Sequence, residues 1–207
     1  MYNPPAFTVA ERAEILAMMR AARLANFVTA TAHGPLATPL PMFIDEKEGE
    51  LGTLYAHLAR PNPQWKAEVI GEALAIFMGP DAYVTPSWYA SKAEHGKVVP
   101  TWSYETVQAR GPVEFFDDTE RLLSVVSRLT NLHEEARPRT WAVTDAPEAF
   151  IAAQLRGIVG LRMPITSLTG KRKMSQNRNE ADRAGVKAGL AASEAPGDRI
   201  AAALIPE

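Results

Sequence analysis

Cysteine is absent from the 207 residues of this chain. The absence excludes a disulfide framework, a thiolate nucleophile and any metal site built on thiolates, and it is typical of a reducing compartment. The first residues, MYNPPAFTVAER, have no apolar stretch of the signal-peptide kind, and no later segment approaches the roughly 20 apolar residues of a membrane span. We therefore expect a soluble, cytoplasmic protein without a membrane segment.

A large excess of one charge is also missing. The net charge is -2 and the pI is near 6.1, so the chain has no overall positive field that attracts nucleic acid phosphates. Contact with DNA would have to be local.

Several nucleotide-binding and catalytic motifs are lacking as well. The sequence contains no G-x-G-x-x-G after a strand, no G-x-x-x-x-G-K-[ST] and no G-x-S-x-G, which argues against a Rossmann unit, a P-loop and a hydrolase nucleophile elbow. The four histidines are scattered without a metal-ligand spacing: His33, His57, His95 and His133. We expect no metal site, and no motif identifies a catalytic residue.

The chain does have enough apolar residues to form a full hydrophobic core. With 46% hydrophobic residues in 207, we expect one domain over residues 1–207. Thr8 and Glu11 form a capping-box pattern before a helical apolar repeat, which predicts an N-terminal helix over 8–24. Apolar stripes predict further helices over 118–135 and 146–155, a helical insertion over 118–155. Residues 171–207 begin as a polar, charged segment and end Ala-rich.

Short segments of strand character fill most of the rest. They cover 26–32, 36–44, 51–57, 73–78, 104–115 and 157–168. The first two are separated by His33-Gly34-Pro35, which is turn chemistry suited to a hairpin, and the strand over 104–115 is expected to bend at Gly111-Pro112. Short strands interrupted by helices, without regular βαβ alternation, predict a mainly β, α+β protein with an antiparallel barrel and peripheral helices.

Three clusters are candidates for binding. The first is HLARPNPQW, from His57 to Trp65, where Asn62 and Pro63 predict a helix start directly after a strand. The free amides of that start, beside Arg60 and His57, suit an anion such as a terminal phosphate. The alternative is structural: Asn62 caps the helix, Arg60 is solvated and His57 is a satisfied edge residue.

The second cluster, residues 83–104, is rich in tryptophan and tyrosine, which suit the stacking of a planar ligand, and Lys92 and Lys97 can meet its charge. Its alternative is an ordinary aromatic core or interface. The third, GKRKMSQNR over 170–178, is the most basic stretch of the chain, interleaved with amides. It is either a charged surface loop or a contact to a phosphate of a cofactor or of DNA.

Taken in order, these segments resemble the PaiB family of FMN-binding negative transcriptional regulators. The resemblance rests on MYNPPAF, HLARPNPQW, GPDAYVTPSWYASK, GKVVPTWSY, LHEE, GIVGL, KMSQNR and DRAGV, and it covers essentially the whole chain. It implies a split β-barrel of the FMN-binding type, in which a homodimer holds two flavins at its interface.

The resemblance also implies roles for ten residues. The phosphate of FMN would be held by His57, Arg60 and Asn62. The isoalloxazine ring would be lined by Trp102, Ser103 and Tyr104. The site would be closed by Lys173, Ser175, Gln176 and Asn177.

Two positions depart from the family pattern. Ser103 stands where Asn is usual, so it lacks the two-sided hydrogen bonding of an amide. Arg172 stands where an aromatic residue is more frequent, and its charge is a candidate for a phosphate or nucleic acid contact.

The resemblance implies a regulator that represses transcription, directly or through a partner, with FMN as a structural or sensing ligand. The sequence shows no helix-turn-helix pattern, which leaves DNA binding weakly supported. The alternative function is a flavin-dependent oxidoreductase of the flavin-reductase or pyridoxamine-phosphate-oxidase type, because one fold serves several functions. A plain flavin carrier is a third hypothesis.

Overall fold

A computed structural model describes residues 1–22 and 24–207. The chain divides into two compact units. Unit 1 comprises Met1–Ala22, Phe77–Val107 and Thr169–Glu207, and unit 2 comprises Arg23–Ile76 and Gln108–Leu168. Two long strands, β6 (Ala73–Val84) and β7 (Thr101–Gly111), contribute residues to both units. The expectation of one domain over the whole chain stays a prediction.

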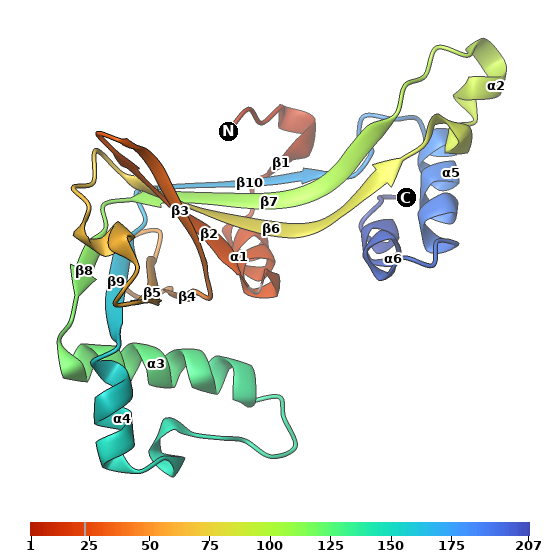
Figure 1. Ribbon diagram of the computed structural model, residues 1–207. Coiled ribbons are helices and arrows are strands. Elements are labelled where there is room, and N and C mark those ends of the chain that lie inside the picture. The colour runs from red at the N-terminus through yellow and green to blue at the C-terminus, as the bar shows by residue number, and fades with distance from the viewer. Residues whose placement is uncertain (23) are drawn as a thin grey trace. The chain divides into compact units, whose positions relative to one another are not determined.

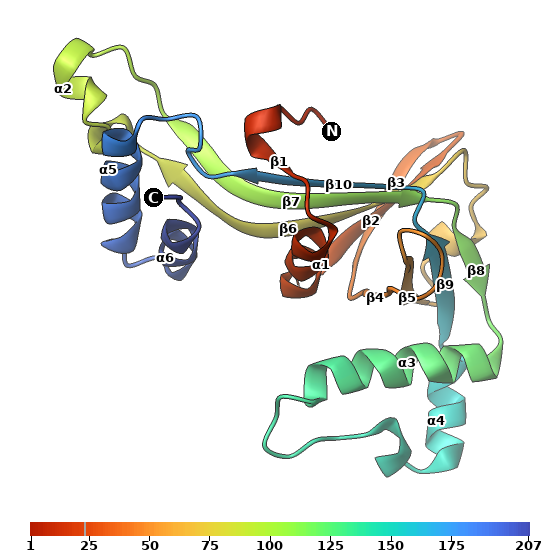
Figure 2. The same cartoon turned by 180° about the vertical axis from the view of Figure 1, so that it is seen from behind.

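Unit 1 contains part of an antiparallel sheet with the order β1-β10-β7-β6. Its remaining elements are η1 (Pro5–Phe7), β1 (Thr8–Val9), α1 (Arg12–Ala21), η3 (Pro86–Trp88), α2 (Ser91–His95), β10 (Ser167–Lys173), α5 (Glu180–Ala191) and α6 (Pro196–Ala203). Figures 1 and 2 show α5 and α6 side by side. Together with the last residues of β6 they bury one cluster of apolar side chains, which includes Val84, Met174, Val186 and Leu190.

The N-terminal helix is shorter than the sequence predicts. It runs from Arg12 to Ala21, not from 8 to 24, and Arg23 lies outside the described residues. Thr8 does not cap it, because Thr8 is paired with Lys171 in the ladder between β1 and β10, and its hydroxyl donates to the carbonyl of Pro4. Strand pairing with a distant segment thus overrides the local capping pattern.

The C-terminal segment 171–207 is polar only at its beginning. Its helix α5 packs closely on η3, where a Cβ atom at Gly185 would lie 2.0 Å from the carbonyl oxygen of Trp88 and one at Gly189 would lie 2.3 Å from the indole ring. Only glycine permits this approach. The glycines of GVKAG are therefore packing positions in the middle of a helix.

Unit 2 contains the order β6-β2-β3 and a second, four-stranded sheet with the order β4-β5-β9-β8. Its elements are β2 (Ala25–Thr31), β3 (Gly34–Leu40), β4 (Phe43–Asp45), β5 (Thr53–Ala59), η2 (Pro63–Lys66), β8 (Glu114–Phe116), α3 (Thr119–Glu134), η4 (Val143–Asp145), α4 (Glu148–Leu155) and β9 (Ile158–Pro164). Strands β2 and β3 form the predicted hairpin, with Thr31 opposite Gly34, and Gly34 takes a φ of 112° that favours glycine.

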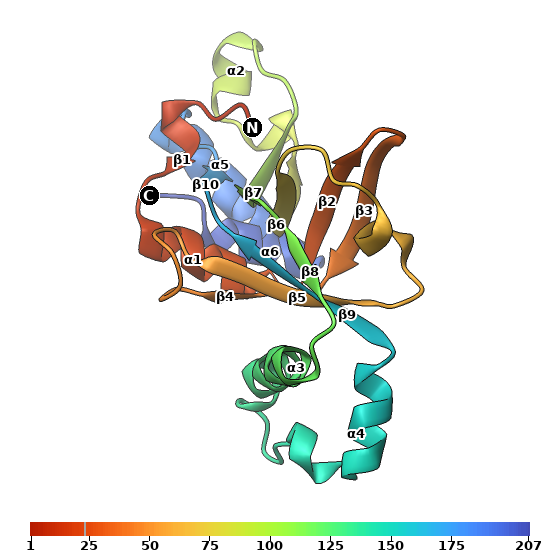
Figure 3. The ribbon, with the colours of Figure 1, turned by 90° about the vertical axis from the view of Figure 1, so that its left-hand side faces the viewer.

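The segment 118–155, for which a helical insertion is predicted, contains α3, η4 and α4. Asp118 caps α3 by accepting a hydrogen bond from the amide of Arg121. The buried side of α3 packs with α4 and the four-stranded sheet through a cluster that includes Leu122, Val125 and Leu155 (Figure 3).

Some strand boundaries differ from the prediction. The segment 36–44 is divided between β3 and β4, and 104–115 is divided between β7 and β8, with the break at the predicted bend of Gly111-Pro112. The predicted strand over 157–168 forms β9 and the first residues of β10. The class is nevertheless as predicted, α+β with antiparallel sheets. Among the helices of the described residues, none combines the length and apolar character needed to cross a lipid bilayer.

Candidate functional site

Four of the seven predicted site residues of unit 1 meet at a small cavity. Its volume is about 100 Å³, and four of the residues that line it are predicted site residues, namely Ser103, Lys173, Ser175 and Asn177. The other lining residues are Tyr89, Val99, Pro100, Thr101 and Arg178. The cavity therefore combines the beginning of β7 with the end of β10 and the loop that follows, two segments about 70 residues apart in the sequence.

Two cations give this cavity a positive character. The ammonium of Lys173 donates hydrogen bonds to the carbonyl of Trp102 at 2.7 Å and to the hydroxyl of Thr101. Burial lowers the pKa of Lys173, because desolvation penalises its charged form. Arg178 lies over the ring of Tyr89, 4.4 Å from its centroid. A bound anionic or carbonyl-rich group would offset the cost of holding these charges away from water.

Two further features indicate that the cavity is built for a ligand. Tyr89 is only 3% exposed, and its hydroxyl has no hydrogen-bond partner among the described residues. Ser175 has a φ of 63°, and no other non-glycine residue of 1–22 and 24–207 has a positive φ. A buried unpaired hydroxyl and a strained backbone both cost free energy, and such costs gather at binding sites. Hydroxyls, an amide and two cations fit the oxygen-rich and nitrogen-rich edge of a flavin.

Gln176 shapes the loop and is not among the residues that line the cavity. Its side-chain oxygen accepts from the amide of Met174 at 2.7 Å, and its side-chain nitrogen donates to the carbonyl of Arg172 at 2.7 Å. Both ends of the amide are thereby used to close the turn that holds Ser175.

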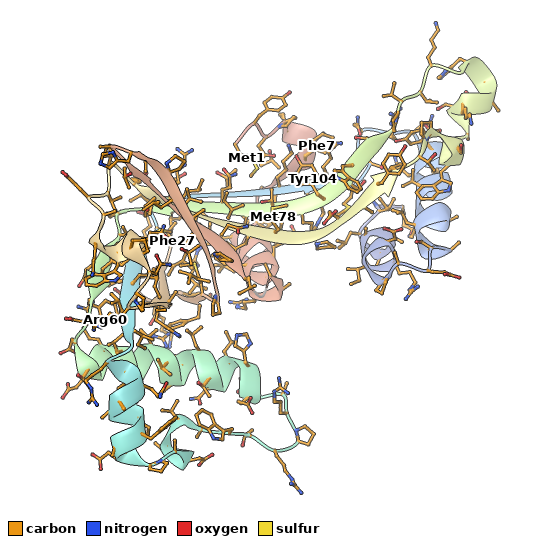
Figure 4. The ribbon with its side chains drawn as sticks, viewed as in Figure 1. Met1, Phe7, Phe27, Arg60, Met78 and Tyr104 are labelled. Carbon is orange, nitrogen blue, oxygen red and sulfur yellow. The ribbon has the colours of Figure 1, made fainter. Side chains whose placement is uncertain are left out.

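Trp102 and Tyr104 lie on the opposite face of β7 from Ser103, because side chains alternate along a strand. Trp102 is 53% exposed and forms an edge-to-face pair with Tyr83, with ring centroids 6.0 Å apart. Figure 4 labels Tyr104 on β7, and the ammonium of Lys171 lies 5.2 Å from the centroid of its ring. The predicted ring-lining residues are thus divided between two faces of one strand.

Arg60 lies in unit 2, where it joins the loop after β5 to the start of β9 (Figure 4). Its guanidinium donates to the carbonyls of Arg156 at 2.8 Å and Ile158 at 3.1 Å, and it lies 3.4 Å from a carboxylate oxygen of Asp117. The guanidinium has five N–H donors, so some are still available to a ligand.

Asn62 caps a single 3₁₀ turn rather than an α-helix. Its side-chain oxygen accepts from the amide of Gln64 at 2.9 Å, and its nitrogen donates to the hydroxyl of Thr38 at 3.0 Å. The predicted helix start is thus shorter than expected and offers fewer free amides. Asn62 lines an open groove of about 420 Å³ beside β3.

His57 faces a different cavity from Asn62. It lines an apolar cavity of about 250 Å³ between the helical insertion and the ends of β5 and β9. Burial lowers the pKa of His57, and its Nδ1 is buried without a partner among the described residues. The imidazole is therefore neutral at pH 7 and supplies no charge for a phosphate.

Of the two departures from the family pattern, Ser103 is 1% exposed and lines the cavity of unit 1. The charge of Arg172 is compensated inside unit 1 by ion pairs with Glu14 and Glu105.

In the part of the chain that the structure describes, no three or more His, Asp or Glu side chains gather as a metal site.

Sequence reasoning missed three polar members of the unit 1 cavity as site residues: Tyr89, Thr101 and Arg178. Thr101 lies on the same strand face as Ser103, so the period-2 alternation of PTWSY could have predicted Thr101 as a site residue. Tyr89 carries no comparable signal, because it is brought in by the packing of η3 against α5.

Comparison with known proteins identifies the family of the chain. A family model described as "Putative FMN-binding domain" matches residues 1–167. The chain belongs to this FMN-binding family. The protease synthase and sporulation protein PAI 2 of Bacillus subtilis is 29% identical over 208 residues, which cover 100% of this chain and 97% of that protein. The resemblance to the PaiB family is thereby confirmed.

A protein of Aspergillus fumigatus is 36% identical over 196 residues, 77% of this chain and 75% of the relative. Among solved structures, the flavocytochrome Anf3 of Azotobacter vinelandii matches with a TM-score of 0.57 at 14% identity, covering 86% of this chain and 75% of that one. The predicted split-barrel fold class is confirmed by such neighbours.

Proposed function

We propose that this member of the PaiB family is a negative transcriptional regulator that binds FMN at a homodimer interface. The observation that carries the proposal is the cavity of unit 1, with its two cations, the unpaired hydroxyl of Tyr89 and the strained Ser175. The family match supports FMN as the ligand.

In this proposal Ser103, Lys173, Ser175 and Asn177 contact the polar edge of the isoalloxazine ring, and Trp102 and Tyr104 supply aromatic surface. Gln176 is a positioning residue, because its amide is already engaged within the loop. When bound, FMN supplies a redox-active ring whose properties respond to charge and hydrogen bonds at its nitrogens.

The phosphate of FMN is assigned to Arg60 and Asn62, which keep free N–H donors. His57 remains part of the predicted set. Its apolar surroundings and neutral imidazole, however, suit a structural or orienting role better than that of a phosphate ligand.

Regulation is proposed to act through a protein partner or through a local DNA contact. The basic stretch 170–178 offers little free charge, since Arg172 is paired with two carboxylates and Lys171 is 7% exposed and donates to the carbonyl of Tyr2. This favours the partner over direct DNA binding.

The proposal is tested on the purified full-length chain. We expect FMN to be taken up at one molecule per chain with a visible flavin spectrum, and light scattering to give the mass of a dimer. A mobility shift on promoter DNA at two salt concentrations tests direct repression, because phosphate-driven binding weakens steeply with salt. A chain that takes up no FMN would refute the flavin assignment, and a monomer would refute the interface.

The second candidate is a flavin-dependent oxidoreductase. It is favoured by the exposure of the aromatic pair, 52% for Tyr83 and 53% for Trp102, which leaves room for a small substrate. Rapid bleaching of bound FMN by NADH or NADPH, followed by turnover with an acceptor, would favour the enzyme over the regulator.

A further inference from the structure

We propose that the apolar cavity of the helical insertion is a second binding site, specific for a small, neutral, aromatic molecule with one hydrogen-bonding group. This cavity has a volume of about 250 Å³ and lies wholly within unit 2. Its walls come from α3, η4 and α4 and from β5 and β9 where these strands end near the insertion. The family match and the flavin proposal assign it no role.

The lining of the cavity determines the class of ligand. Apart from His57 and the neutral amide of Gln154, its walls are apolar side chains such as Val126, Ile151 and Leu155. None of the described residues that line it carries a carboxylate, ammonium or guanidinium group. An ion would lose its hydration there without a counter-charge. Neutral molecules are therefore preferred.

Two large aromatic side chains border the cavity and are not buried by the fold. Trp141 is 47% exposed and Phe150 is 55% exposed. Exposed rings beside an apolar hollow lose solvent contact when a flat ligand enters, which favours an aromatic occupant.

One polar group in the wall is left without a partner. His57 lines the cavity, and no hydrogen bond to either ring nitrogen is formed by the described residues; Nδ1 is buried, so Nε2 is the ring nitrogen that a ligand can reach. A neutral imidazole has one N–H donor and one acceptor nitrogen. A ligand that supplies a single N–H or O–H group would donate to Nε2, a nitrogen that the protein itself leaves without a partner.

The volume sets the size of the ligand. An apolar cavity of about 150 Å³ is known to hold benzene, so a cavity of about 250 Å³ suits a bicyclic ring of the size of indole. The lining of this cavity also differs from that of the unit 1 cavity, which carries the two cations Lys173 and Arg178.

The test uses a matched pair of probes, indole and indene, which have the same shape but differ in the N–H group. Calorimetric titration of the full chain is expected to show one indole per chain, bound roughly three- to tenfold more tightly than indene, the ratio that one hydrogen bond gives. Equal affinities, or tighter binding of benzoate than of indole, would overturn the assignment.

Two variants locate the binding. Ala146→Phe places a ring in the cavity and is expected to abolish indole binding. The control, Ala153→Phe, places the same ring on α4 at an exposed position that does not line the cavity, and it is expected to bind indole as the unmodified chain does. Unchanged indole binding in Ala146→Phe would refute the site. If that variant fails to fold, His57→Phe provides the second test, since it should bring the affinities for indole and indene together.

The same titrations are run with and without FMN. We expect the affinity for indole to be unaffected by saturating FMN, because the two proposed sites share no residue that contacts a ligand in both. Competition between the two ligands would overturn the inference. A chain that binds indole but no FMN would refute only the proposed function.

Discussion

Replacing Lys173 by methionine is expected to weaken flavin binding by about 10- to 150-fold. An ammonium has three N–H donors, and two of those of Lys173 are directed at Thr101 and at the carbonyl of Trp102. One donor is therefore left for the ligand. A hydrogen bond from a charged group contributes about 1.5–3 kcal/mol, and each 1.4 kcal/mol is tenfold in affinity.

The assay is quenching of flavin fluorescence, titrated in parallel with FMN and with riboflavin, which lacks the phosphate. If Lys173 contacts the ring edge, the variant loses the same factor for both ligands. Lys187→Met is the matched control, because Lys187 is a half-buried residue on α5 that does not line the cavity and whose partner is Glu207. It should bind both flavins as the unmodified chain does.

The two ligands also separate the possible errors in this reasoning. An unchanged affinity for FMN in Lys173→Met would remove Lys173 from the site. A loss for FMN alone, with riboflavin unaffected, would assign Lys173 to the phosphate and refute the ring-edge assignment. That second pattern is what we expect instead for Arg60→Ala.

Three further predictions concern stability. The pKa of His57 is lowered from 6.5 in the fold, so the unfolded chain binds more protons near that pH and the free energy of unfolding falls as the pH drops below 6.5. In urea titrations His57→Phe should remove this part of the pH dependence. The same dependence of unfolding free energy on pH in both chains would contradict the prediction. Gln64→Leu should cost about 2–4 kcal/mol, because Gln64 is 1% exposed and its side-chain amide pairs with the hydroxyls of Thr29 and Thr38, of which that of Thr29 is buried. A cost below about 1 kcal/mol would mean that these hydroxyls find other partners. Gly185→Ala should lower stability by about 1–3 kcal/mol through the clash with Trp88, although alanine is the better helix former, and a gain in melting temperature would refute the close packing of α5 on η3.

Local signals in the sequence predicted local structure well. Asp118 marks the start of α3, and His33-Gly34-Pro35 marks a hairpin, because capping and turn chemistry depend on neighbours within a few residues. The prediction at Thr8 was wrong for the complementary reason. Its partner, Lys171, lies more than 160 residues away, and nothing near Thr8 in the sequence indicates that pairing.

The residues of the candidate site could be predicted from the sequence better than their arrangement in space. The motifs KMSQN and PTWSY supplied Lys173, Ser175, Asn177 and Ser103, which line one cavity. The alternation of side chains along a strand is by itself enough to separate Trp102 from Ser103. The positive φ of Ser175 was beyond reach, since serine rarely adopts that conformation and no local pattern requires it.

The basic run of β10 shows why charge in a sequence is a poor guide to charge on a surface. Three consecutive cations have three different tasks: Lys171 is buried against Tyr2 and Tyr104, Arg172 neutralises two carboxylates, and Lys173 lines the cavity. Each phosphate contact to DNA requires a cation that is free to replace a counterion. Because these three are engaged in packing, ion pairing and the cavity, a regulator of this design would sense its ligand through β10 and act on transcription through another surface.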